Sequence, residues 1–450
     1  MSDSSRTIVY AYFSAALLLF GLQIVFGFLS LAKYLGPDPL LYIANFATTK
    51  AVHTNVLLVW VLTGFMGAAY YIVPEESRTE IHSPTLAYLQ LGLWLAIGVA
   101  TVGLYLFGVT EGRKLLEMPT PLKYGVVVVM LIFLYNLFMT LRKGERFTTT
   151  EGVLIGGLAS AALLFIPALI HFDNYTLDRF YRWWVVHLWV EGVWELIMGG
   201  ILAFLLIRIS GADREVMEKW LYVIVGLTFL SGILGTGHHY YWIGVPAYWL
   251  WVGGFFSALE PLAFLFMAAF AYTLMRRSGL SHPNVMALHW TLGATVFSAI
   301  GAGILGFAHT WPGVNKWTHG THITTMHGHM AFFGAYAMIN LAIISYARPM
   351  LFGITDQAAQ TRTSVWAFWL MVGGMFGMTM ALAAAGIVQT YLERILGFGY
   401  LETQAKIQVH YLMWLATSLL FSLGVGAYLV DFLWMGSARS RARPAMAEAG

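Results

Sequence analysis

The sequence predicts an all-α integral membrane protein with about twelve transmembrane helices, and three observations lead to this prediction. The composition is 59% hydrophobic and only 10% charged, with a mean hydropathy of +0.70, which is far more apolar than a soluble domain. Apolar runs of about twenty residues, each long enough to cross a bilayer as a helix, recur along the whole chain. The connections between them are short and carry turn residues. We therefore expect residues 1–450 to form a single membrane-embedded domain, with a flexible C-terminal tail from about 436.

The limits of the predicted spans follow from where each apolar run gives way to charged or turn residues. The first run begins after Arg6 and is too long for a signal-peptide core, so we expect it to be retained as a span. Turn residues at 34–39 separate it from the second run, and charged residues at 142–146 separate the fourth from the fifth. In order, the predicted spans are 8–32, 47–73, 84–110, 122–142, 152–171, 181–208, 217–237, 247–275, 286–309, 319–347, 364–392 and 407–434.

The distribution of positive charge predicts that both termini lie in the cytoplasm. Lys and Arg are retained preferentially on the cytoplasmic side of a membrane. Twelve spans place both termini on one side, and that side holds fifteen of the 25 Lys and Arg residues, leaving ten on the other. The fifteen are Arg6, Arg78, Arg142, Lys143, Arg146, Arg208, Arg214, Lys219, Arg276, Arg277, Arg348, Arg362, Arg439, Arg441 and Arg443.

The absence of cysteine limits the cofactors that the chain can bind. Without any Cys, the protein has no disulfides, no thiolate-ligated haem, no iron–sulfur cluster and no cysteine-ligated copper. The net charge of +3 gives no indication of a nucleic-acid partner. Any cofactor that carries electrons must be held by other side chains.

Six histidines and three glutamates lie within the predicted spans, where polar groups are unfavourable unless they are paired. Their positions along five different spans agree in depth, because they fall in the half of the membrane away from the termini. Scattered core histidines would have no reason to share one level. We therefore interpret the group as a single buried metal assembly. Its members are His53, His187, Glu191, Glu195, His238, His239, Glu260, His327 and His329.

Helix geometry divides these residues among different sites. His327 and His329 are two residues apart, which corresponds to about 200° around a helix, so their side chains point to opposite faces. They cannot bind one iron atom, but they can bind two different haems. His187 and Glu191 are four residues apart and share one face, as two ligands of one ion must.

The adjacent His238 and His239 complete the predicted metal site. They follow the segment 235–237, Gly-Thr-Gly, at the end of a predicted helix, where a glycine-rich backbone can direct both imidazoles at one centre. Three histidines and one carboxylate are typical ligands of non-haem iron.

The same residues carry a resemblance to the haem-copper oxidase superfamily, and within it to the cytochrome c-dependent nitric oxide reductases. The resemblance covers nearly the whole chain and implies the twelve-helix bundle of that superfamily. It rests on four specific segments, which are Tyr70–Ser77, Trp183–Glu195, Gly235–Tyr240 and His327–His329.

The resemblance implies a role for each candidate residue. His53 and His329 would ligate a low-spin haem b, and His327 a high-spin haem b3. A non-haem iron would face the second haem, and two glutamates would be buried acids beside it. The implied iron ligands are His187, His238, His239 and Glu191, and the implied acids are Glu195 and Glu260.

Position 191 discriminates between activities within the superfamily. The main oxygen reductases have a tyrosine four residues after the first metal-ligating histidine, and this chain has Glu191 there. A carboxylate suits iron better than copper and leaves no redox-active side chain at that point. Oxygen reduction therefore remains the alternative, and nitric oxide reduction is the favoured function.

The resemblance also implies the reaction, in which two NO, two electrons and two protons give N2O and water. Glu195 and Glu260 are the candidate proton donors, although Glu195 could instead only hydrogen-bond another acid. The inner half of the predicted spans carries almost no Asp, Glu or Lys, so a carboxylate path from the cytoplasm is missing. We expect protons to come from the outer side and the reaction not to pump.

The loop 111–119 is where this family supplies a carboxylate to a calcium ion that bridges haem propionates. Lys114 stands where an acid is expected. This leaves Glu117 or Glu111 as the candidate calcium ligand, with a surface ion pair as the alternative.

Electrons must come from a partner, because the chain has no haem c attachment motif. The resemblance implies a heterodimer with a membrane-anchored cytochrome c subunit in a bacterial inner membrane. It also implies a soluble cytochrome c or cupredoxin as donor. Quinol-using relatives carry an extra N-terminal span and a soluble domain, which are not expected here. A pure electron-carrying cytochrome b or a transporter would have no use for both sets of histidines.

Overall fold

The computed structural model describes residues 1–36, 44–279 and 282–447, with the backbone alone for Glu260, Ser278 and residues 436–447. Twelve helical segments are long and apolar enough to cross a membrane. Each of them overlaps one predicted span, so the predicted fold class is confirmed. The backbone of the last helix continues to Ala447. The flexibility expected from about 436 stays a prediction, and residues 448–450 lie outside the described part.

Most spans are built around one long helix, and several also contain a π-helical or 3-10 segment. The spans are α1 (Asp3–Ala32), α2 (Phe46–Ser77), α3 (Pro84–Leu106), α4 (Thr120–Leu141), α5 (Thr149–Phe165) with η1 (Pro167–Leu169), α6 (Tyr175–Leu188) with η2 (Trp189–Val193) and α7 (Trp194–Ser210), α8 (Arg214–Gly235) with η3 (Thr236–His239), α9 (Tyr248–Ser257) with α10 (Glu260–Ser278), α11 (Val285–Ser298) with η4 (Ala299–Leu305) and α12 (Gly306–Thr310), α14 (His322–Phe332) with η5 (Phe333–Ala337) and α15 (Met338–Phe352), α16 (Arg362–Thr390) with η6 (Tyr391–Ile395), and α18 (Gln408–Ala447). Two short helices, α13 (Pro312–Thr318) and α17 (Tyr400–Lys406), lie between spans.

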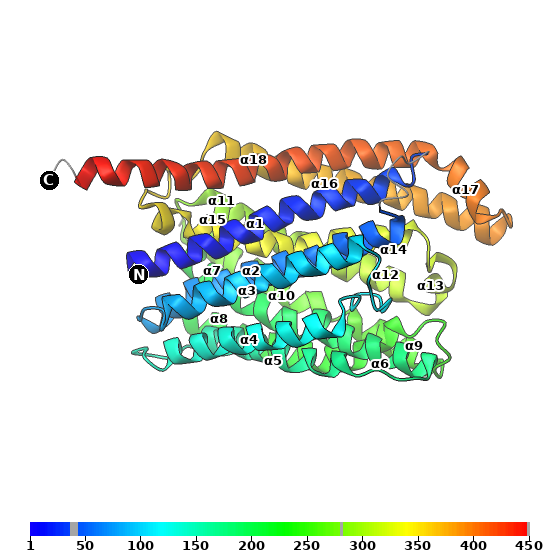
Figure 1. Cartoon of the computed structure of the whole chain (residues 1–450), viewed down its shortest axis with the longest axis horizontal. Coiled ribbons are helices and arrows are strands. Elements are labelled where there is room, and N and C mark those ends of the chain that lie inside the picture. Colours follow the sequence, from blue (N-terminus) through cyan, green and yellow to red (C-terminus); the bar gives the residue numbers. More distant parts are fainter. Residues whose placement is uncertain (37–43, 280–281, 448–450) are drawn as a thin grey trace.

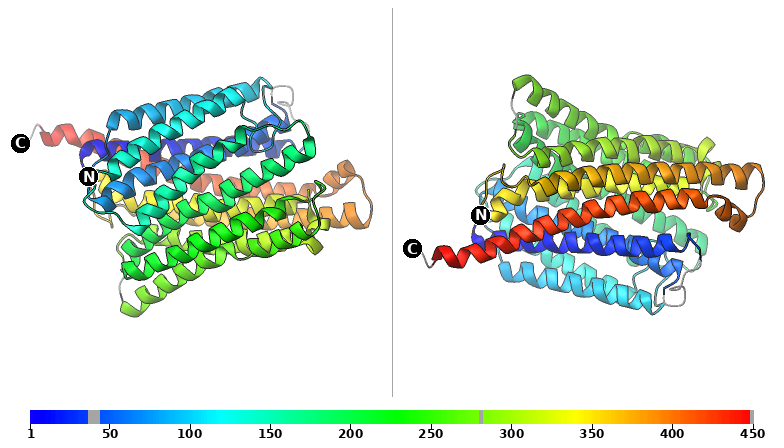
Figure 2. Two further views of the ribbon diagram at one scale, coloured as in Figure 1. Left: turned by 90° about the horizontal axis from the view of Figure 1, so that it is seen from below. Right: turned by 90° about the horizontal axis from the view of Figure 1, so that it is seen from above.

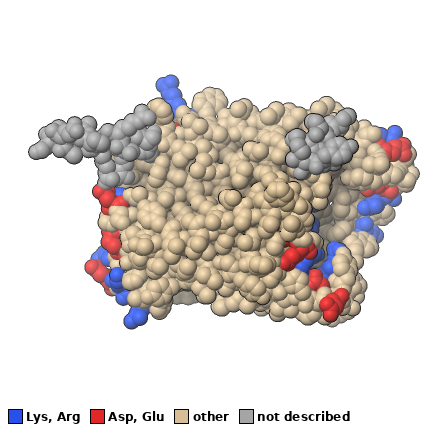
Figure 3. Space-filling model, in the orientation of Figure 1, with Lys and Arg blue, Asp and Glu red and all other residues tan. Residues whose placement is uncertain are grey.

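The helices form one elongated bundle, and both termini lie at the same end of it (Figures 1 and 2). Figure 3 shows that charged side chains gather towards the two ends of the visible face, with a broad uncharged belt between them. This belt is what a bilayer requires of a spanning surface. We refer to the end away from the termini as the outer end.

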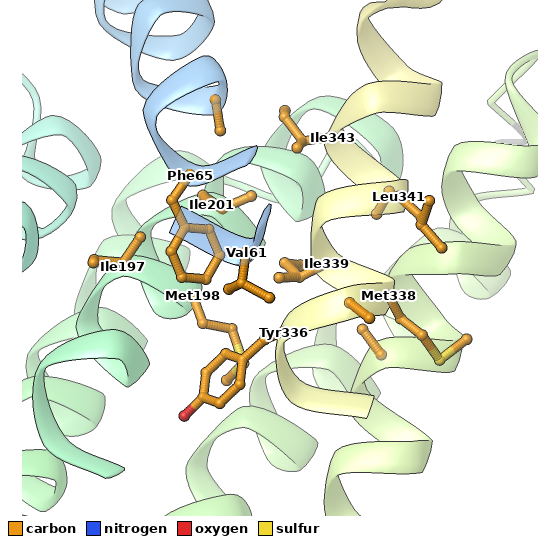
Figure 4. Close-up of a cluster of buried hydrophobic side chains, with 14 of the residues drawn as sticks. Val61, Phe65, Ile197, Met198, Ile201, Tyr336, Met338, Ile339, Leu341 and Ile343 are labelled. Atoms are coloured by element: carbon orange, nitrogen blue, oxygen red, sulfur yellow. The ribbon is translucent and has the colours of Figure 1, made fainter. Parts of the chain in front are cut away.

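Three of the twelve spans form the centre of the bundle. Spans 46–77, 175–210 and 322–352 have 83%, 89% and 83% of their most apolar window buried, whereas the others have 50% or less. Figure 4 shows how they meet: Val61 and Phe65 from α2, Ile197 and Met198 from α7, and residues of η5 and α15 pack together. These three spans also carry five of the predicted ligands, so the central packing fixes the position of the site.

The inner end contains a buried ionic cluster that joins three spans. Glu76 on α2 is fully buried, and its carboxylate lies 3.1 Å from Arg208 on α7 and 2.7 Å from Arg214 on α8. A buried carboxylate is tolerated because these partners neutralise it. The contacts hold the inner ends of α2, α7 and α8 together.

Candidate metal and haem centres

Four of the predicted ligands meet at one point near the outer end. One donor atom from each of His187, Glu191, His238 and His239 lies within 4.8 Å of the other three, and no second group of this kind occurs among the described residues. The structure therefore brings the four residues together from α6, η2 and η3. The set contains three imidazoles and one carboxylate, which suits iron.

The Glu191 carboxylate lies at the centre of this group. Its Oε1 is 3.1 Å from Nε2 of His239, and its Oε2 is 3.3 Å from Nε2 of His238 and 3.5 Å from Nδ1 of His187. The Nε2 atoms of His238 and His239 are 2.8 Å apart. His187 is fully buried, and neither of its ring nitrogens has a hydrogen-bond partner. Buried polar atoms without partners are unfavourable, and a bound cation would satisfy the one ring nitrogen that faces it.

A π-helical segment places the carboxylate. The chain leaves the α-helical path at Trp189–Val193 and resumes it at Trp194. Single π-turns within α-helices occur frequently at functional sites. Glu191 lies in the middle of this segment, so its position relative to His187 is not that of two residues in a regular helix. The sequence contained no signal for this irregularity.

Close contact between helix backbones holds the other two histidines. The 3-10 segment η3 packs against α9, and a Cβ atom added to Gly253 would overlap the backbone nitrogen of His238. A side chain at position 253 would therefore push η3 away from Glu191.

We expect Gly253→Ala to lower the metal content of the purified protein. Overpacking of this kind destabilises by about 1–3 kcal/mol, and here the strain falls on a predicted metal ligand. Gly226→Ala is the matched control, because its Cβ would meet no atom within 4 Å. Metal analysis of both variants checks the expectation, and equal metal content would contradict it.

Residues that the sequence did not suggest orient the clustered histidines. Nδ1 of His238 is hydrogen-bonded to the hydroxyl of Ser257, and the ring of His239 stacks on Trp183 at 4.8 Å with an angle of 1°. Such contacts fix the orientation of an imidazole that binds metal. They could not be found from sequence, because α6, η3 and α9 meet only in the folded bundle.

His53 and His329 face each other across a cavity of about 460 Å³. Their ring centroids are 6.2 Å apart and the rings are inclined by 29°. A ring nitrogen of imidazole binds a metal ion such as zinc at a distance of about 2 Å. Two imidazole rings that bind one metal atom from opposite sides therefore have centroids about 6 Å apart. Nδ1 of His53 donates to the carbonyl of Gln23, and Nδ1 of His329 donates to that of Thr325. Each Nε2 is left available for a metal, so the pair fits the two axial positions of one haem.

His327 points to a different neighbour, as expected from the helix geometry. Its Nδ1 donates to the carbonyl of Gly301 in η4 at 2.9 Å. Unlike His329, it does not line the large cavity. The two histidines thus face opposite sides of α14, and the Nε2 of His327 is available for a second haem. Nearby His309 has both ring nitrogens hydrogen-bonded to threonines, Thr318 and Thr324.

Of the two predicted buried acids, one can be described. Glu195 lies four residues after Glu191, is 8% exposed, and its Oε2 is 3.5 Å from the hydroxyl of Thr228. No other described side chain forms a hydrogen bond with it. Glu260 begins α10, but its side chain lies outside the described atoms. Its predicted position beside the metal site therefore stays a prediction.

The predicted calcium ligand has other contacts. Glu117 Oε2 accepts a hydrogen bond from Asn55 Nδ2 at 3.0 Å. The Glu111 carboxylate is bound by Lys123 and by the backbone N–H of Thr120. The described residues place no cluster of acidic side chains in this loop, although calcium generally takes about six to eight oxygen ligands. Glu111 and Glu117 alone do not supply the oxygen ligands of a calcium ion, and calcium binding in this loop stays a prediction.

Comparison with known proteins agrees with this arrangement. Residues 7–421 match the family model described as cytochrome c and quinol oxidase polypeptide I. The chain is 46% identical to a nitric oxide reductase subunit of Stutzerimonas stutzeri, over 96% of this chain and 95% of that protein. It is 23% identical to a cytochrome c oxidase subunit 1 homologue of Agrobacterium tumefaciens strain T37, over 93% of this chain and 80% of that protein.

A solved structure shares the fold. A haem-copper terminal oxidase matches with a TM-score of 0.73 at 16% identity, over 97% of this chain and 84% of that chain. The bundle and its histidines define a membrane protein built to bind metal cofactors. The chain belongs to the cytochrome c and quinol oxidase polypeptide I family of haem-copper oxidases, as its motifs predicted.

Proposed function

We propose that the protein is the catalytic subunit of a nitric oxide reductase, which converts two NO, two electrons and two protons into N2O and water. One observation carries the proposal: the carboxylate of Glu191 lies within 3.1–3.5 Å of all three clustered histidines. This carboxylate takes the place of the tyrosine expected of an oxygen reductase. The nitric oxide reductase subunit of Stutzerimonas stutzeri, to which the chain is 46% identical, supports the same function.

Each group of residues has a part in this reaction. His187, His238, His239 and Glu191 would hold a non-haem iron, His327 a high-spin haem b3, and the pair His53 and His329 a low-spin haem b. When bound, these groups supply the electrons and the Lewis acidity that the coupling of two NO molecules requires. The ligand residues on α6, η2, η3 and α14 would hold the two irons at one place in the bundle, so that two substrate molecules could be held close together.

The acids beside the metal site would deliver protons. Glu195 is buried one turn from Glu191, and among the described side chains only Thr228 forms a hydrogen bond with it, at 3.5 Å. It is therefore able to exchange a proton without breaking an ion pair. Together with Glu260 it would form the last part of a path from the outer side, and the reaction would not pump protons.

The partner of this subunit would supply the electrons. We propose a heterodimer with a membrane-anchored cytochrome c subunit, reduced by a soluble cytochrome c or cupredoxin, in a bacterial cytoplasmic membrane. Both termini would lie in the cytoplasm, which places the metal site towards the outer side. His329 and His327 lie two residues apart on one helix, so they would hold the two haems near enough to each other for electron transfer.

Elemental analysis of the purified complex, together with its haem content, tests the proposal. We expect one non-haem iron for two haems b in this subunit and no copper, with N2O formed from NO under anaerobic conditions. One copper per protein and no turnover of NO would instead indicate a haem-copper oxygen reductase, the alternative that family membership leaves.

A further inference from the structure

Three positively charged side chains gather at the outer end of the cavity between His53 and His329. We call Lys50, Lys114 and Arg182 the mouth cluster. Lys50 and Lys114 line the cavity itself. Lys50 lies three residues before His53 on α2, so it is one turn from a proposed haem ligand. Arg182 lies on α6, is only 6% exposed, and its Nε has no hydrogen-bond partner.

Two other cations in this region are paired with carboxylates. Arg113 lies 3.0 Å from Asp178, and Lys123 contacts Glu111. The three members of the mouth cluster form no ion pair with any carboxylate whose side chain the structure describes, a set that leaves out Glu260. All three instead contact an aromatic ring. Nζ of Lys50 is 5.7 Å from the ring centre of Phe46. Nζ of Lys114 is 5.5 Å, and Cζ of Arg182 is 5.2 Å, from the ring centre of Trp183.

Repulsion among the three cations is unfavourable, and a bound anion would relieve it. Lys50 and Lys114 are exposed to solvent, whereas Arg182 is buried. Desolvation by neighbouring protein atoms, with added repulsion from Lys50 and Arg182, lowers the pKa of the Lys114 ammonium from its usual value to about 8. The tryptophan ring offsets part of this repulsion. A carboxylate bound among the three cations would offset much more of it, because charge-assisted hydrogen bonds in a partly buried site are strong.

The position of the cluster identifies the ligand. The cavity is lined mainly by apolar side chains and has one imidazole on each side, so it suits a flat tetrapyrrole ring. The polar part of such a ligand is its pair of carboxylate side chains, and the mouth cluster lies at one end of the cavity. A divalent cation between these carboxylates would need further oxygen ligands. In the loop, Glu111 is paired with Lys123, and Glu117 Oε2 accepts a hydrogen bond from Asn55, which lines the same cavity. Residue 114 is a lysine, which offers no oxygen.

We propose that Lys50, Lys114 and Arg182 bind the carboxylates of the haem directly, and that the ammonium of Lys114 replaces a bridging divalent metal ion in this protein. The proposal rests on the proposed function only in that a haem occupies the cavity. It does not depend on which substrate is reduced.

The metal content of the wild-type protein is the first test. After removal of loosely bound ions on a desalting column, we expect less than about one calcium in ten protein molecules, since the loop lacks the oxygen ligands that calcium requires. We also expect treatment with EGTA to leave the haem spectrum and haem content unchanged. One tightly bound calcium per protein, whose removal by EGTA shifts the haem spectrum, would overturn the proposal.

Substitution of Lys114 is the second test, with the midpoint potential of the low-spin haem as the measurement. A nearby cation favours the reduced haem, so we expect the potential to fall in Lys114→Met and to recover in Lys114→Arg. Lys316→Met is the matched control, because Lys316 is an outer lysine that lies 5.3 Å from the ring of Trp317 but does not line the cavity. An unchanged potential in Lys114→Met would overturn the proposal, whereas loss of the haem from this variant alone would support it.

A third variant tests whether position 114 can be converted to a calcium ligand. In Lys114→Glu we expect calcium to bind and the haem spectrum to become sensitive to EGTA. None of these measurements requires NO turnover. If the protein reduced oxygen instead of NO, the proposed function would be refuted and the role of the mouth cluster would be unaffected. If the protein reduced NO but the haem potential did not change in Lys114→Met, the role of the mouth cluster would be refuted and the proposed function would be unaffected.

Discussion

The variant Glu191→Ala is expected to lose its non-haem iron and its NO reductase activity while it keeps the low-spin haem. Glu191 is the only carboxylate among the four clustered residues, and its two oxygens face all three histidines. Even the loss of a group that merely supports a metal ligand lowers metal affinity or activity by about 10–100-fold. We therefore expect NO turnover to fall by at least about 100-fold, and the non-haem iron to be missing from the purified variant.

Glu195→Ala is the matched control for this experiment. It removes a carboxylate from the same span, four residues later, but Glu195 does not belong to the ligand cluster. We expect it to keep the iron, whatever happens to proton delivery. Iron analysis and spectra of both variants separate ligation from proton transfer. Full activity in Glu191→Ala would exclude the ligand role.

The variant His53→Ala is expected to lose the low-spin haem selectively. His53 forms one side of the imidazole pair whose centroids lie 6.2 Å apart, and no other described histidine faces His329 across the cavity. We expect the low-spin haem spectrum to disappear and electron supply from a cytochrome donor to stop. The iron bound by the α6, η2 and η3 residues should be retained, because its ligands are in other helices.

A control for this variant is His289→Ala. His289 is half-buried on α11, packs against Phe368, and does not line the cavity. Its haem spectrum should match that of the wild type. If His53→Ala also had an unchanged spectrum, the assignment of the low-spin haem would have to be abandoned.

Much of the architecture could be predicted from the sequence because the bilayer simplifies the problem. Length and hydropathy located all twelve spans, and the two-residue spacing of His327 and His329 placed them on different sides of α14, where the structure has them. The structure also brings His187 and Glu191 together, although the helix between them is π-helical and not regular. The two side chains meet there although Glu191 lies in the irregular turn, so the rule for a regular helix predicted the contact but not its geometry.

The features that the sequence did not predict depend on contacts between distant segments. Ser257, Trp183 and the carbonyl of Gly301 orient histidines only because η3, α6, α9 and η4 meet in the bundle. The mouth cluster could not be predicted for the same reason. Its three members are far apart in sequence, and each alone looks like an ordinary charge at the end of a span.

The order of the ligands along the chain has a consequence for biogenesis. All four residues of the metal cluster, and the Ser257 and Gly253 that support them, lie before residue 258, whereas His327 and His329 come about 70 residues later. At a synthesis rate of about 5–20 residues per second, the ribosome completes the proposed iron ligands several seconds before the proposed haem ligands His327 and His329. Under the proposed assignment, metal capture by the nascent chain would be separable in time from haem insertion, and the two deliveries would not require the same cellular machinery.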